Sequence, residues 1–190
     1  MNTTLPPGLP VPVDDGAAAH LPGKAIPPLS LPSTDGSAFP IDRPPLGFDS
    51  LVLYAYPRTG RPGEPELTPD WDSIPGARGC TPEACGFRDH ARELAAFGAA
   101  VAGVSTQPTE EQREVVERLE LPFPLLSDED LRMAKALDLP TFDFAGRILL
   151  KRLTMIVREG VVQKVFYPVF PPDRHAEEVL GWLRSDGGSF

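Results

Sequence analysis

The chain has 190 residues, of which 41% are hydrophobic, so it can form one domain with a substantial apolar core. Its 18 basic and 27 acidic side chains give a formal net charge of -9, which argues against binding to nucleic acid or to anionic membranes. No apolar run is long enough to span a bilayer, and Asp14 and Asp15 lie where a secretory signal would be apolar. We therefore expect a cytoplasmic protein, in which two cysteines are more often redox-active than structural.

The start of the chain is rich in proline. Residues 1–32 contain eight of the 24 prolines, and we predict an arm that is extended and partly disordered, or laid over the domain. The domain itself is expected over residues 33–190. The turn sequence Ser33-Thr34-Asp35-Gly36 predicts a small hairpin between residues 29–31 and 39–41.

A continuous apolar run at residues 51–56, ended by Pro57, predicts a central strand that is covered on both faces. Residues 58–79 are rich in glycine, proline and charge, and they predict a long loop. Long ordered loops in compact domains are commonly functional. Trp71 and Ile74 are the sizeable apolar side chains that we expect to pin this loop to the domain.

Helices and strands alternate through the rest of the chain. We predict a helix from Thr81 to Gly98, a strand at 99–105, a helix at 108–119, a strand at 123–126, a helix at 128–137, a hairpin of strands 152–158 and 161–167, and a helix at 176–183. Such alternation implies parallel crossovers, and the hairpin adds an antiparallel pair. The predicted fold class is α/β, with a mixed central sheet flanked by helices.

Both cysteines, Cys80 and Cys85, lie where the long loop turns into a helix. The helix dipole and the unpaired N–H groups of a first turn favour thiolate over thiol, which makes Cys80 a candidate reactive sulfur. The plain alternative is a pair of small buried apolar side chains. Five helical residues separate two Cα atoms by roughly 8 to 9 Å, whereas a disulfide needs about 7 Å or less. A bridge between the two therefore requires the helix start to unwind.

This pair suits a two-step redox cycle. The Cys80 thiolate would reduce an oxidant and become a sulfenic acid, and Cys85 would condense with it to form a disulfide. An external dithiol would then reduce the bridge by exchange. A metal site of Cys80, Cys85 and His90 is disfavoured because steps of five do not share one helix face and a fourth ligand is missing. No cofactor is expected.

The run from Gly79 to Asp89, GCTPEACGFRD, with Tyr56-Pro57 at the preceding strand end, resembles the peroxiredoxins, and most closely their bacterioferritin-comigratory or Q-type branch. Residues 152–157, RLTMIV, are similar to the family's R-x-T-hydrophobic strand. The resemblance covers roughly residues 25–185. It implies a thioredoxin-like fold with an N-terminal extension.

The resemblance also implies roles for particular residues. Cys80 corresponds to the peroxidatic cysteine, Cys85 to the resolving cysteine, and Arg152 to the arginine that stabilises the thiolate and orients peroxide. Without the motif, Arg152 would equally be a surface arginine. Glu83 corresponds to the family's acidic residue, although an acid is also favourable at any helix N-terminus.

The sequence departs from the family in the loop before the reactive cysteine. The family writes Pro-x-x-x-Thr-x-x-Cys, but here Ser73 and Ala77 stand at the proline and threonine positions. Pro57 keeps the strand-end context, and about twenty residues appear inserted after it. Thr59 is the nearest candidate for the family's threonine hydroxyl, which bonds to peroxide and to the sulfur.

Thr81 is a weaker candidate for that hydroxyl.

Three roles stay open for the apolar loop at residues 167–172. It packs against the domain, forms an apolar wall at the active site, or contacts another subunit.

The implied function is a thiol-dependent peroxidase for hydrogen peroxide and organic hydroperoxides, with an intramolecular Cys80–Cys85 disulfide. A thioredoxin- or glutaredoxin-type protein would recycle it, and the chain would be a monomer or homodimer. Two alternatives stay open: a redox-sensing or binding module whose disulfide switches a surface without turnover, and a general disulfide reductase.

Overall fold

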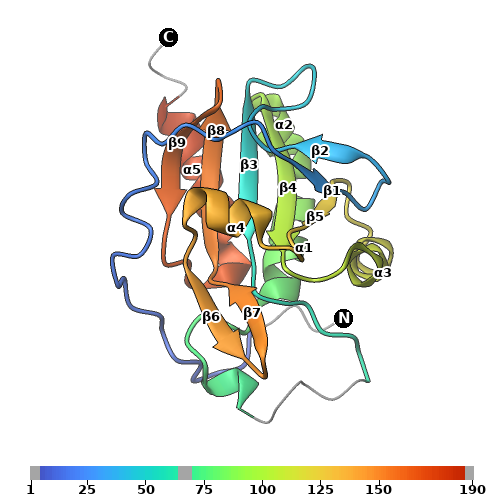
Figure 1. Cartoon of the computed structure of the whole chain (residues 1–190), viewed down its shortest axis with the longest axis vertical. Coiled ribbons are helices and arrows are strands. Elements are labelled where there is room, and N and C mark those ends of the chain that lie inside the picture. The colour runs from blue at the N-terminus through green and yellow to red at the C-terminus, as the bar shows by residue number, and fades with distance from the viewer. Residues whose placement is uncertain (1–4, 64–69, 187–190) are drawn as a thin grey trace.

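The computed structural model describes residues 5–63 and 70–186 and has a five-stranded mixed sheet at its centre (Figure 1). The strand order is β5-β4-β3-β8-β9. Neighbours are parallel from β3 to β5 and antiparallel from β3 to β9. The strands are β3 Ser50–Ala55, β4 Ala99–Ser105, β5 Leu125–Ser127, β8 Leu153–Arg158 and β9 Val161–Phe166. These strand directions confirm the predicted mixed sheet. The burial of every residue of β3 confirms the predicted central strand that is covered on both faces.

Helices cover one face of this sheet and a mixture of elements covers the other. One apolar cluster joins the sheet to α1, α2, α3 and α5, and a second joins it to α4 and to residues near the N-terminus. The helices are α1 Cys80–Asp89, α2 Ala91–Ala96, α3 Thr109–Leu119, α4 Arg132–Leu137 and α5 His175–Asp186. The helix predicted from Thr81 to Gly98 is thus two helices that meet at His90.

A hairpin that was not predicted extends beyond the sheet. It consists of β6 Thr141–Phe144 and β7 Arg147–Leu150, which pair antiparallel. Trp71, in the 3-10 helix η1 Trp71–Ser73, packs against Phe144 with ring centroids 5.1 Å apart. The expectation that Trp71 and Ile74 pin the long loop is confirmed, since both belong to the cluster between that loop and the hairpin.

The proline-rich start of the chain lies over the domain. Its lower part runs along the β9 edge and reaches the end of the molecule where η1 lies (Figure 1). Ala25 pairs with Val161 of β9, and Leu21 is fully buried in the core. The predicted hairpin is confirmed as β1 Ser30–Pro32 and β2 Ala38–Pro40. Among the described residues, no helix has both the length and the apolarity that a bilayer span needs.

Candidate active site

Cys80 is the first residue of α1 and the centre of the site. The helix is entered through Gly79, whose φ of 108° is open to glycine but strained for other residues. A Cβ at Gly79 would lie 2.4 Å from Cγ of Pro172, so the chain also passes too close to its neighbour for a side chain. Cys80 is only 5% exposed, and both cysteines are free thiols. The sulfur is therefore enclosed at the start of a tightly entered helix.

Arg152 brings a cation to this sulfur. It lies between β7 and β8, and its Nη2 donates to Cys80 Sγ at 3.1 Å. Its Nη1 donates to the carboxylate of Glu83, and both charged side chains are buried. A planar guanidinium can serve both groups at once because its donors form a fixed fork. The structure thus brings together Cys80, Glu83 and Arg152, three residues that the sequence analysis singled out.

The remaining donors of Arg152 hold the loop that leads into the helix. Nε donates to the carbonyl of Gly76 at 3.3 Å, and Nη2 also donates to those of Ala77 and Arg78 at 3.2 and 3.3 Å. The thiol of Cys80 lies 3.6 Å from the carbonyl oxygen of Ala77. One side chain therefore fixes both the sulfur and the backbone just before it.

Burial and charge oppose each other at the sulfur. Burial raises the pKa of the Cys80 thiol, the Arg152 guanidinium lowers it, and the nearby Glu83 carboxylate raises it. Burial also raises the pKa of Glu83, against the attraction of Arg152 and His175. Two groups that can become anionic thus share one buried cation. The thiolate expected from the helix start alone depends here on Arg152.

Glu83 follows Cys80 by three residues, so both lie on one face of α1. Its Oε1 has no hydrogen-bond partner among the described residues. His175, at the start of α5, is also buried: its Nε2 is 2.8 Å from Thr154 Oγ1 and its Nδ1 is 3.0 Å from Glu178 Oε2. The burial of this histidine beside the site could not be predicted, because no local pattern in the sequence links the start of α5 to α1.

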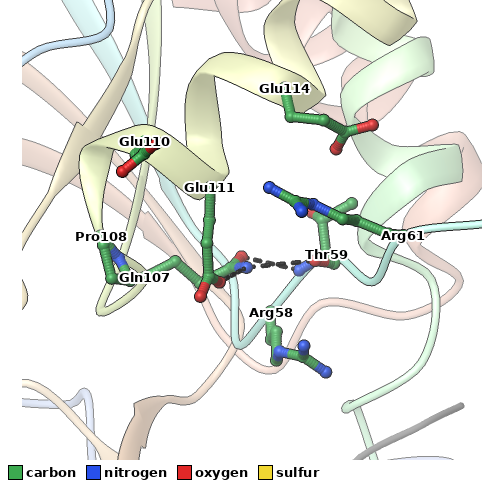
Figure 2. Close-up of a pocket in the computed structure, with 8 residues that line it drawn as sticks. All are labelled: Arg58, Thr59, Arg61, Gln107, Pro108, Glu110, Glu111 and Glu114. Carbon is green, nitrogen blue, oxygen red and sulfur yellow. Dashed lines mark hydrogen bonds between the residues drawn. The ribbon is translucent and has the colours of Figure 1, made fainter. Parts of the chain in front are cut away.

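Thr59 is buried but is held by another residue. Its N–H donates to Gln107 Oε1 at 2.8 Å, and its carbonyl accepts from Gln107 Nε2 at 3.1 Å. Figure 2 shows Gln107 between Thr59 and Glu111 in a pocket. Within the described parts of the chain, neither Thr59 nor Thr81 forms a hydrogen bond with Sγ. The main chain of Arg58 lowers the pKa of Cys80.

Cys85 lies further along the same helix and is also buried. Burial raises the pKa of its thiol, and Arg88 lowers it. Because both cysteines are helical residues in α1, the geometric argument from the sequence applies to the folded protein. The two sulfurs cannot bond until the first turns of α1 unwind.

A cavity of roughly 330 Å³ lies beside this cluster. Arg152 and Pro57 contribute to its lining, so Pro57 belongs to the surroundings of the site. No group of three or more potential metal ligands occurs in the described residues.

Comparison with known proteins identifies the family of this chain. Residues 21–180 match the family model called Redoxin, and the chain belongs to the peroxiredoxins within that family. It is 30% identical over 163 residues to the chloroplastic peroxiredoxin Q of Sedum lineare. The aligned region covers 86% of this chain and 77% of that protein.

Two solved structures are similar over nearly their whole length. Peroxidoxin BcpB of Mycobacterium tuberculosis has a TM-score of 0.69 and 30% identity, over 87% of this chain and 98% of that one. Reduced Prx3 of Vibrio vulnificus, solved in complex with hydrogen peroxide, has a TM-score of 0.64 and 25% identity, over 87% and 97%. The predicted family, thioredoxin-like fold and enzyme class are confirmed: the chain is a thiol-dependent peroxidase.

Proposed function

We propose that this peroxiredoxin reduces hydrogen peroxide and organic hydroperoxides at Cys80, that Cys85 resolves the oxidised sulfur, and that a thioredoxin- or glutaredoxin-type protein recycles the bridge. The observation that carries the proposal is the 3.1 Å contact between Arg152 Nη2 and Cys80 Sγ inside a buried site. A charge-assisted donor of this kind stabilises the thiolate, which is the nucleophile. The similarity to Vibrio vulnificus Prx3, solved with hydrogen peroxide, supports the substrate class.

The first step forms a sulfur–oxygen bond. The Cys80 thiolate attacks the terminal oxygen of the peroxide, the O–O bond breaks, and the leaving hydroxide or alkoxide takes up a proton. Sulfur is oxidised by two electrons to a sulfenic acid, and the peroxide is reduced to water or an alcohol. In this proposal Arg152 also donates to a peroxide oxygen, while Glu83 holds the guanidinium in place.

The second step forms the bridge. The Cys85 thiol attacks the sulfenic sulfur of Cys80, and water leaves with the thiol proton. This step needs α1 to unwind at its start, because both cysteines lie on the folded helix. An external dithiol then attacks the disulfide and restores both thiols.

Within this proposal Pro57 forms part of the cavity wall beside Arg152. Thr59, held by Gln107, positions the neighbouring backbone of Arg58. We also propose a cytoplasmic location and a monomer or homodimer, as expected from the sequence.

The test is peroxide consumption with a dithiol reductant, followed by mass spectrometry after one equivalent of hydrogen peroxide. Cys80→Ser should abolish consumption, and Cys85→Ser should still be oxidised at Cys80 without forming the intramolecular bridge. Ser73→Ala is the matched control, because Ser73 is exposed and its hydroxyl donates to the carbonyl of Asp70 rather than to a group at the cysteines. An unchanged rate in Cys80→Ser would refute the proposal. A redox sensor would instead consume one equivalent and then stop.

A further inference from the structure

We propose that residues 5–17, here called the arm, form one wall of a binding site for hydroperoxides that carry an apolar group. The arm precedes residue 21, where the match to the redoxin family begins, so this wall is an addition to the family's domain. The inference rests on the proposed reduction of peroxides at Cys80.

The cavity beside Arg152 is lined mostly by apolar residues, with Arg152, Lys151 and Tyr167 as its polar members. Its volume is roughly 330 Å³, which suits a small organic molecule. Three segments build the walls: the arm through residues 11–13, the long loop through residues 74–76, and the segment after β9 through residues 167–169. An apolar wall at the active site was one of the roles expected for the loop at residues 167–172.

Arg152 joins this cavity to the chemistry. It lines the cavity, and its Nη2 is 3.1 Å from Cys80 Sγ. A peroxide group bound beside Arg152 would meet the donors of its guanidinium, while the carbon substituent would extend along the apolar walls. Hydrogen peroxide has no such substituent and gains nothing from them.

The arm is fastened by residues that themselves line the cavity. Lys151 Nζ donates to Asp15 Oδ2 at 2.6 Å, and the Tyr167 hydroxyl donates to Asp15 Oδ1 at 2.7 Å. These bonds lower the pKa of Asp15. Further along the arm, Leu5 lies against the entry to α1, where a Cβ at Gly79 would be 3.0 Å from its Cδ2. The arm therefore runs past the segment that carries Cys80.

The apolar side chains of the arm are left uncovered at this cavity. Val11 is 61% exposed and Val13 is 82% exposed, although both line it. An apolar substituent would remove part of this surface from water, which is favourable. The arm thus favours bulky organic hydroperoxides over hydrogen peroxide.

The test compares two substrates in one protein. The double variant Val11→Asp/Val13→Asp places charge in the wall without touching Arg152 or the cysteines. Its kcat/KM for cumene hydroperoxide should fall roughly five- to tenfold, with the value for hydrogen peroxide unchanged. Leu46→Asp is the matched control, because Leu46 is fully exposed and does not line the cavity. If the double variant fails to fold, Asp15→Asn serves as the second test, because it weakens the fastening of the arm. It should lower the ratio of kcat/KM for cumene hydroperoxide to kcat/KM for hydrogen peroxide.

An unchanged substrate ratio in active variants, or an equal loss for both peroxides, would overturn the role of the arm and leave the peroxidase intact. A wild-type chain that consumed neither peroxide would overturn the proposed chemistry at Cys80, and the inference with it.

Discussion

At the residue scale, Arg152 determines what the buried sulfur can do. Its guanidinium contacts Cys80 and Glu83 together and holds three carbonyls of the preceding loop. Removal of one partner from a buried ion pair commonly costs about 3–5 kcal/mol, because the other charge is left without compensation. The same arrangement that stabilises the site therefore also controls the reactivity of the thiol.

The first prediction concerns pH. Burial raises the pKa of Cys80, so its reaction with peroxide should become faster as pH rises, with a midpoint above the ordinary thiol value of about 8.5. In Glu83→Gln the midpoint should move to lower pH, because the Glu83 carboxylate raises that pKa. Single-turnover oxidation in the Cys85→Ser background measures both profiles, and identical midpoints would contradict the prediction.

The same shift links stability to pH. The pKa of Cys80 is higher in the folded chain than in the unfolded chain. Its contribution to the free energy of unfolding is therefore complete below the unfolded-state pKa, and it is lost as pH rises through the folded-state value. Urea titrations at alkaline pH should show a smaller loss of stability in Cys80→Ser than in the reduced wild type.

At the element scale, the entry to α1 combines strain relief with close packing. Gly79 has a φ of 108° and approaches Pro172 of the 3-10 helix η2 Pro172–Arg174. Both features hold the helix start in place, yet the proposed Cys80–Cys85 bridge needs that start to unwind. Gly79 therefore influences both how firmly the reduced site is held and how readily the first turn of α1 unwinds.

Substitution at Gly79 should be more damaging than strain alone. Gly146 also has a positive φ, of 73°, but a Cβ there would meet nothing within 4 Å. Gly146→Ala should cost roughly 1–2 kcal/mol of unfolding free energy from the left-handed backbone. Gly79→Ala should cost roughly 2–5 kcal/mol, because a steric conflict adds to the strain. Equal losses in urea denaturation would show that the contact with Pro172 is unimportant.

At the scale of the whole molecule, the proline-rich segment is packed onto the domain from residue 18 onward. Leu21 is fully buried, and the backbone of Gly23 and Lys24 pairs with Val162 of β9. The segment covers the sheet face that α1, α2, α3 and α5 leave open. The predicted domain boundary, with the domain over residues 33–190, stays a prediction.

The burial of Leu21 gives a direct measure of this packing. Leu21→Ala should lower the free energy of unfolding by about 2–5 kcal/mol, since it leaves a cavity in the core. Leu46→Ala, at a fully exposed site, should change it by less than about 0.5 kcal/mol. Thermal or urea unfolding compares the two, and a loss at Leu21 as small as at Leu46 would mean that the segment does not contribute to the core.

Local patterns in the sequence predicted the elements whose information is local. The continuous apolar run of β3 and the helix that starts at the cysteines are confirmed by the structure. They could be predicted because the period of a strand or helix is written within the element itself. The role of Arg152 came from the resemblance to a family, since nothing nearby in the sequence marks it.

Tertiary packing alone decided the rest. The β6–β7 hairpin was missed because its apolar side chains pack against Trp71, Ile74 and Ala77, about seventy residues earlier. His175 lies near Glu83, and Thr59 lies against Gln107, through contacts between distant segments. The sequence by itself pointed to the two cysteines as the candidate redox groups, and the family resemblance added Arg152. Only the folded structure placed Arg152 on the sulfur and the arm beside the cavity, because those contacts join segments that no local period relates.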